Sequence, residues 1–379
     1  MASYRLTGGQ IIRDGTLAAG DLAIADGVVA EAAPGARVID ATGLILAPGI
    51  VDLHGDGFER NLSPRPGVYF DLDTALMETD AQLVTNGITT AYLALTISWE
   101  PGLRSLDQGR ALIAAWQRLR PHFMADIRIQ LRWEIYALEA ADQIEAWLSL
   151  DPAPMLAFND HYLNLLADGR EADKVAKYAA RSGLSEAEFR ALIARVGARA
   201  DEVPGTIARL ATAAKAAGVI CLAHDEKSPE VRHDHRALGI DVCEFPLTRP
   251  TAEDAIAKGE HTILGAPNVL RGGSHIGAID AAPAIADGLC TCLASDYYYP
   301  AQLRAAAKLG NGSAEALARH WAVVSTNPAA AAGMAPRGTL TAGAEADVIA
   351  LRLTDAGPQT EMVFRAGNLV WSRAQRAAA

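Results

Sequence analysis

Histidine and carboxylate residues at the ends of apolar segments are the residues of this 379-residue chain best suited to chemistry. The apolar run that begins at Leu44 ends in His54-Gly55-Asp56, and side chains two apart in a strand point the same way. Imidazole and carboxylate ligands suit zinc, manganese or iron, so this spacing predicts half of a metal site. A strand that is apolar throughout is typical of a parallel sheet covered by helices. The C-terminal end of such a strand is where a β/α barrel carries its chemistry.

Seven further apolar segments follow, most of them separated by helical patterns such as 204–217 and 252–258. The expected strands are Ile50–His54, Thr89–Leu95, Ile127–Ile135, Met155–Asn159, Val219–Ala223, Asp241–Phe245, Thr262–Gly265 and Thr291–Ala294. Regular alternation of strands and helices predicts an α/β fold with a parallel sheet. Eight units predict a closed (β/α)8 barrel of the TIM type.

Both ends of the chain read as short strands broken by hairpin signals such as Asp14-Gly15 and Asp26-Gly27. Neither end is large enough to bury a good core alone, so we expect the two ends to combine into one small β-sandwich. The predicted organisation is a sandwich subdomain made of residues 1–49 and 337–379, and a barrel made of residues 50–336.

Most of the expected barrel strands end within one or two residues of a histidine or a carboxylate. Scattered surface polarity would not concentrate at one end of every strand, so we expect these side chains to gather at a single rim. Several have plainer interpretations: Glu134 could pair only with Arg132, His161 could be a core histidine, and Asp225 could anchor a loop. The role of Glu244 is left open. The expected metal ligands are His54, Asp56, Glu134, His161, His224 and Asp296, and Asp296 is also the expected proton carrier.

Two loops beside the expected barrel mouth look suited to an anionic group. Glycines let backbone N–H groups approach an oxyanion, and an arginine offers a two-pronged donor to phosphate. One loop is Arg271-Gly272-Gly273-Ser274-His275, and the other places Arg65 between two prolines, which could also be only a rigid connector. Tyr297 follows the last strand and is expected to contact a substrate.

The composition excludes several classes of function. A net charge of -11 argues against nonspecific nucleic-acid binding, which needs a basic face. We expect no secretory leader and no membrane span. The four cysteines lie in apolar runs without zinc-finger spacing, so they predict buried side chains in a reducing cytoplasm. A homodimer is the general expectation for an enzyme of this kind.

The chain resembles the amidohydrolase superfamily in its paired terminal strands, in the segment 47–54, in the aspartate after the eighth strand and in the late segment Gly338-Thr339-Leu340. It resembles the PhnM family more narrowly, through His54-Gly55-Asp56 with Ser63-Pro64-Arg65-Pro66, through the long string 265–275, and through Ser295-Asp296-Tyr297-Tyr298. Members of that family are α-D-ribose 1-methylphosphonate 5-triphosphate diphosphatases of the carbon–phosphorus lyase pathway. The resemblance covers nearly the whole chain.

The sequence departs from the wider superfamily at three positions. Asp56 replaces the second histidine of the usual His-x-His motif, as in the PhnM family. No lysine follows the fourth strand, so Glu134 is the best candidate for a bridging ligand. Glu244 stands where many relatives carry a histidine.

The resemblance implies hydrolysis of a polyphosphorylated ribose, releasing pyrophosphate and leaving a 5-phosphate. It implies a divalent cofactor, zinc or manganese, as one or two ions, with Asp296 taking the proton from water and the two arginine loops holding the triphosphate. One alternative is an amidohydrolase that cleaves a C–N bond, as a deacetylase or a deaminase does. The other is a scaffold without enzymatic activity, against which the retained ligand set argues.

Overall fold

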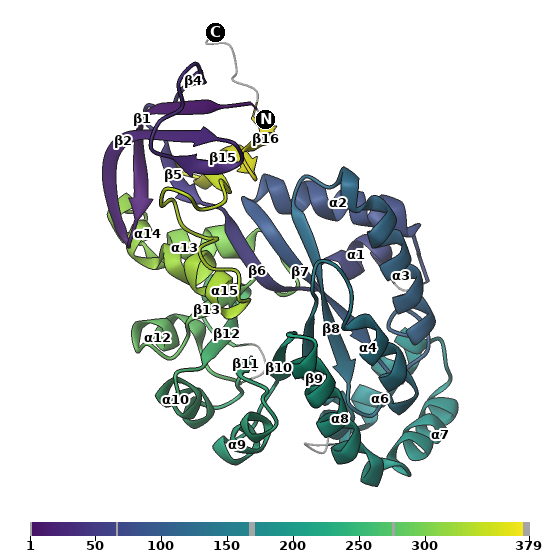
Figure 1. The fold of residues 1–379 in the computed structure, drawn as a ribbon. Coiled ribbons are helices and arrows are strands. Elements are labelled where there is room, and N and C mark those ends of the chain that lie inside the picture. Colours follow the sequence, from purple (N-terminus) through teal and green to yellow (C-terminus); the bar gives the residue numbers. More distant parts are fainter. Residues whose placement is uncertain (1, 66, 167–170, 275–276, 374–379) are drawn as a thin grey trace.

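The structure is a computed structural model, and it describes residues 2–65, 67–166, 171–274 and 277–373. One sheet forms a barrel surrounded by helices, and a second sheet made from both ends of the chain lies against the barrel (Figure 1). This is the α/β architecture that the sequence predicts.

The barrel sheet has eight strands whose spatial order follows the chain, and every neighbouring pair is parallel. The strands are β6 (Ile50–Gly55), β7 (Ile88–Ile97), β8 (Asp126–Glu134), β9 (Met155–Asn159), β10 (Ile220–His224), β11 (Val242–Glu244), β12 (His261–Gly265) and β13 (Cys292–Ala294). All eight strands predicted from the sequence are therefore confirmed, with boundaries that differ by at most a few residues.

The barrel closes where β13 returns to β6. The backbone N–H of Asp296 donates to the carbonyl of His54 (2.9 Å), and the N–H of Asp56 donates to the carbonyl of Asp296 (2.9 Å). Just below them, the buried carboxylate of Asp52 accepts hydrogen bonds from the backbone and the hydroxyl of Ser295. Closure therefore brings the first and last strand ends, with their candidate ligands, side by side.

Helices cover the outside of the barrel and begin where the sequence places capping residues. Asp71, Ser105, Ser228 and Thr248 each accept a hydrogen bond from a backbone N–H in the first turn of the helix that follows. The outer helices are α2 (Leu72–Thr85), α3 (Leu106–Leu119), α4 (Ala141–Trp147), α8 (Val203–Ala216), α9 (Pro229–Ala237), α10 (Arg249–Ala257), α12 (Ala281–Ala286) and α13 (Ala301–Leu309).

Shorter helices fill the connections between these elements. They are α1 (Phe58–Leu62), α5 (His161–Leu166), α11 (Ala266–Arg271), α14 (Ala314–His320) and α15 (Thr326–Ala331), together with 3₁₀ turns at Arg120–His122, Leu138–Ala140, Ala200–Glu202 and Trp321–Val324. After β9, α6 (Glu171–Ser182) and α7 (Glu186–Gly197) pack on the loop that follows β7. Arg181 pairs there with the buried Glu100, and the rings of Phe189 and Trp99 lie 5.8 Å apart.

Strands from both ends of the chain form the second sheet, seen as purple and yellow strands together in Figure 1. They are β1 (Tyr4–Arg13), β2 (Thr16–Ala25), β3 (Val28–Ala30), β4 (Arg37–Asp40), β5 (Ile45–Pro48), β14 (Val348–Thr354), β15 (Gly357–Arg365) and β16 (Asn368–Ser372). Two strands, β5 and β14, separate β1 from β15, yet the rings of Tyr4 and Phe364 lie 5.1 Å apart. The sheet therefore folds over its own small core, as the predicted sandwich requires.

Apolar side chains fill the interior of the barrel below the candidate site, among them Val51, Leu53, Leu222 and Ile263. All four cysteines are buried and unpaired, as expected, and burial raises the pKa of the Cys221 thiol to about 12. Among the described residues, no helix combines the length and the apolar character needed to cross a bilayer.

Candidate active site

A cavity of about 160 Å³ opens among the C-terminal ends of the barrel strands. Its walls come from the ends of β6, β8, β10, β12 and β13 and from the loops that follow them. The polar residues among its lining are His54, Asp56, Arg132, His224, Asp225, Asn268, Ser274, Asp296 and Tyr297. The cavity therefore lies at the rim where a β/α barrel carries its chemistry.

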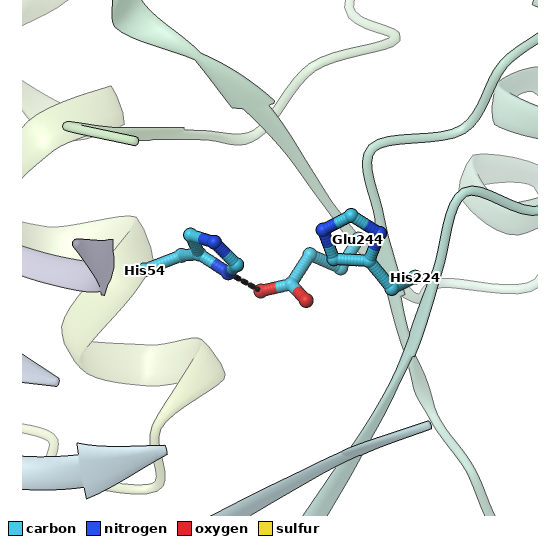
Figure 2. A group of neighbouring side chains, drawn as sticks. All are labelled: His54, His224 and Glu244. Atoms are coloured by element: carbon cyan, nitrogen blue, oxygen red, sulfur yellow. Dashed lines mark hydrogen bonds and ion pairs between the residues drawn. The ribbon is translucent and has the colours of Figure 1, made fainter. Parts of the chain in front are cut away.

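His54, His224 and Glu244 converge on the floor of this region from β6, β10 and β11. One ligand atom from each lies within 4.8 Å of the others. Figure 2 shows the Glu244 carboxylate pointing toward His54, whose Nδ1 lies 3.0 Å from Oε1. Gln130 donates to the same carboxylate oxygen at 2.7 Å. With Nδ1 engaged by Glu244, Nε2 is the free donor atom that His54 can offer to a metal.

One atom of this group, Oε2 of Glu244, is buried without a hydrogen-bond partner among the described residues. Nδ1 of His224 lies 3.1 Å from Oδ2 of Asp225, which leaves Nε2 of His224 as the atom that can face a metal. Burial alone would raise the pKa of Glu244, but the charge and hydrogen bond of His54 hold that pKa below its usual value. Burial lowers the pKa of His224, which keeps its imidazole neutral. A charged carboxylate with one unsatisfied oxygen beside a neutral imidazole fits a divalent cation, because a buried carboxylate oxygen is rarely left unpartnered in a protein interior.

A second group shares His54 and adds Asp56 and Asp296, again with ligand atoms within 4.8 Å of one another. Asp296 has a positive φ of 56°, which turns its side chain into the rim as the chain leaves β13. Burial, reinforced by the nearby Asp56 charge, raises the pKa of Asp296 to about 6. Two carboxylates this close repel each other, and a cation between them would relieve that repulsion.

Glu134 and His161, also expected as ligands, instead hold each other beside these groups. Nδ1 of His161 lies 2.7 Å from Oε1 of Glu134, and the other carboxylate oxygen accepts from the His161 backbone N–H at 3.0 Å. The side-chain amide of Asn159 also donates to Glu134. The rings of His161 and His224 lie 6.5 Å apart, so the pair adjoins the cluster without joining either group of three.

Only some of the residues expected to bind substrate line the cavity. Ser274 and Tyr297 line the cavity. Arg65, Arg271 and Gly272 are exposed, and none of them, nor Gly273, is among the lining residues. His275 lies outside the described residues.

No family model matches the chain, but one curated protein is similar in sequence and several solved structures are similar in fold. The chain is 28% identical over 347 residues to the alpha-D-ribose 1-methylphosphonate 5-triphosphate diphosphatase of Escherichia coli, spanning 88% of this chain and 90% of that protein. The fold matches an amidohydrolase from an environmental sample of the Sargasso sea, with a TM-score of 0.64 at 15% identity over 98% of this chain and 93% of that one. The chain therefore has the fold of these amidohydrolases.

Other solved structures share this fold while differing in the chemistry that their names state. Dihydropyrimidinase from Brevibacillus agri aligns over 97% of this chain and 94% of its own, with a TM-score of 0.63 at 14% identity. The 5-methylcytosine deaminase from Klebsiella pneumoniae aligns over 99% of both chains, with a TM-score of 0.61 at 16% identity. Identities this low show the fold alone and leave the chemistry to the site residues.

Two residues of this candidate site, Gln130 and Arg132, were not expected there from the sequence. Gln130, Arg132 and Glu134 stand at alternate positions of β8 and are all buried. All three contact the cluster: Gln130 through Glu244, Arg132 through Asp56 and His161, and Glu134 through His161. Polar residues two apart in an otherwise apolar strand share one face, and that pattern could have placed all three in the site.

Proposed function

We propose that this chain hydrolyses α-D-ribose 1-methylphosphonate 5-triphosphate to the 5-phosphate and pyrophosphate, as a step in phosphonate catabolism. The similarity to a diphosphatase that acts on this compound, spanning about nine-tenths of both chains, is the observation that carries the proposal. The paired ligand groups at the barrel rim support it, because they offer the donor atoms that a metal-dependent hydrolase needs.

The residues proposed to hold the metal are His54, His224, Asp56, Asp296 and Glu244, and zinc or manganese, as one or two ions, suits them. When bound, such an ion supplies Lewis acidity and makes hydroxide available near neutral pH. Glu134 and His161 stay candidates as ligands, although each is now the other's partner.

The remaining roles, which are proton transfer, positioning of His54 and contact with the substrate, are proposed for residues of the chain. Asp296 is proposed to take the proton from the attacking water, because its carboxylate lies at the rim beside His54 and Asp56 and lines the cavity. Gln130 fixes Glu244, and Glu244 fixes the ring of His54. Ser274 and Tyr297 line the cavity and are proposed to contact the substrate there.

The test is direct. The purified protein, loaded with Mn²⁺ or Zn²⁺, is incubated with the ribosyl 5-triphosphate, and pyrophosphate and monophosphate release are measured separately. We expect pyrophosphate, and we expect the metal-stripped protein to release none. A hydantoin, a dihydropyrimidine and an acetylated amino sugar serve as C–N substrates. Turnover of one of these without pyrophosphate release would replace the proposal with the C–N alternative.

A further inference from the structure

Arg132 is the only arginine or lysine on the cavity wall among the residues that the structure describes. It lies near the end of β8, two residues before Glu134, and its side chain is only 6% exposed. A guanidinium cannot lose its charge in a protein, so a buried one must find partners for its five N–H donors.

The partners of Arg132 are weak. Nη1 lies 3.8 Å from the Asp56 carboxylate, which is beyond hydrogen-bond distance, and Nη2 lies 3.4 Å from Nε2 of His161. Its buried Nε has no hydrogen-bond partner among the described residues.

Two other buried arginines show what close pairing with carboxylates looks like in this protein. Arg232 places Nη1 3.0 and 3.1 Å from the two carboxylate oxygens of Glu226. Arg337 places its two Nη atoms 2.6 and 2.5 Å from the carboxylates of Asp126 and Glu345. Arg132 is buried to a similar degree, and its charge faces the carboxylates of Asp56, Glu134, Asp225 and Asp296. No hydrogen bond joins it to any of these four described carboxylates, so its N–H donors stay available to a ligand in the cavity.

We infer that Arg132 binds an anionic oxygen of the substrate inside the cavity, next to the His54–Asp56–Asp296 group. In the proposed reaction this is a phosphoryl oxygen of the triphosphate, and to that extent the inference rests on the proposed function. The other charged walls of the cavity are the acids Asp56, Asp225 and Asp296, which repel a polyanion. Arg132 takes over the role that the sequence suggested for Arg65 and Arg271, because its planar fork of donors matches a phosphoryl group.

The experiment uses the full chain with its bound metal and three variants: Arg132→Met, Arg132→Lys and Arg128→Met. Arg128 lies on the same strand four residues earlier, pairs with Asp126, and is absent from the cavity wall, so it is the matched control. Inorganic phosphate is titrated into each protein by calorimetry without added free metal. Circular dichroism and elemental analysis report fold and metal content, and KM and kcat for the ribosyl triphosphate are measured in parallel.

We expect Arg132→Met to weaken phosphate binding and to raise KM by about 10- to 100-fold, since hydrogen bonds to charged groups have this magnitude. Arg132→Lys should recover part of the affinity, because it keeps the charge and loses the fork. Arg128→Met should match the wild type.

Unchanged phosphate affinity in Arg132→Met would overturn the inference, even if the protein proves to be the diphosphatase. Loss of metal in both Arg132 variants would also overturn it, since Arg132 would then only support the ligand cluster. Arg132-dependent phosphate binding without turnover of the triphosphate would refute the proposed function alone.

Discussion

His54 belongs to both candidate ligand groups, so the chemistry of the rim depends on which atom its ring presents. Glu244 engages Nδ1, and a buried carboxylate fixed by Gln130 has little freedom to move away. Burial disfavours a charged imidazole, yet the Glu244 charge raises the pKa of His54 above its usual value. The Glu244 charge therefore favours the protonated ring, and a metal at Nε2 must displace the proton on that nitrogen, which couples metal affinity to pH.

Replacing Glu244 with glutamine tests this dependence. We expect Glu244→Gln to lower metal affinity by about 10- to 100-fold, because the carboxylate that orients His54 and offers its own free oxygen is lost. Competition with a chromophoric chelator measures the affinity. Glu253→Gln, an exposed glutamate that pairs with Arg249, is the control. Equal affinities for Glu244→Gln and wild type would exclude Glu244 from the metal site.

Asp296→Asn separates proton transfer from folding. Asparagine tolerates the positive φ of this position, so the fold should survive. Turnover should fall by about 100-fold or more, the usual effect of losing a general base. Steady-state kinetics at equal metal content measures it, with the exposed Asp287→Asn as the control. Near-normal turnover in Asp296→Asn would show that another residue takes the proton.

At the scale of elements, the sequence predicts the strands, whose apolar residues follow a regular pattern, but not the directions of loops or the pairing of side chains at strand ends. Periodic apolar runs give all eight barrel strands, and parallel topology then brings His54, His224 and Asp296 to one rim. The direction of a loop leaves no periodic pattern in the sequence. The positions of Arg65 and Arg271 relative to the cavity could therefore not be predicted, and both residues are exposed and absent from the cavity wall. The pairing of Glu134 with His161 depends on side-chain rotamers at neighbouring strand ends, which sequence spacing does not specify.

One of the buried contacts that close β6 onto β13 can be tested separately. Ser295 donates through its hydroxyl (2.5 Å) and its backbone N–H (2.9 Å) to Asp52, whose pKa burial raises. Ser295→Ala removes the hydroxyl and leaves a buried carboxylate oxygen unsatisfied, so we expect a loss of about 1–3 kcal/mol in the free energy of unfolding. Urea denaturation measures it. Ser149→Ala, at an exposed serine, should change stability by less than about 0.5 kcal/mol; similar losses in both variants would contradict the role of this contact.

At the scale of the whole molecule, Arg337 connects the barrel to the segment that leads into the terminal sheet. Its guanidinium contacts Thr90 on β7 and Asp126 on β8, and it also contacts Glu345, just before β14. Asp347 lies 3.6 Å from the Nε atom of the same arginine, and its Oδ1 accepts from the backbone N–H of Ala366, which follows β15. The two sheets are therefore joined through one buried network of charges rather than through apolar packing alone.

Asp347 makes this junction sensitive to pH. Burial raises its pKa to about 6 in the folded protein, against an ordinary value of 3.8. Below pH 4 the carboxyl is protonated in both folded and unfolded chains. Between pH 4 and 6 only the folded chain keeps the proton, so this group's contribution to stability falls as pH rises and is lost above pH 6. The difference of about two pKa units corresponds to about 3 kcal/mol.

Asp347→Asn removes the titrating group while keeping an oxygen that can accept from Ala366. We therefore expect the free energy of unfolding of the wild type, relative to Asp347→Asn, to fall by up to about 3 kcal/mol between pH 4 and pH 7. Urea denaturation at several pH values measures this difference, and subtraction cancels the titration of every other group. Asp355→Asn, at an exposed aspartate in the turn between β14 and β15, should run parallel to the wild type. Parallel curves for Asp347→Asn and wild type would mean that this carboxyl is already ionised in the folded protein, with Arg337 compensating its charge.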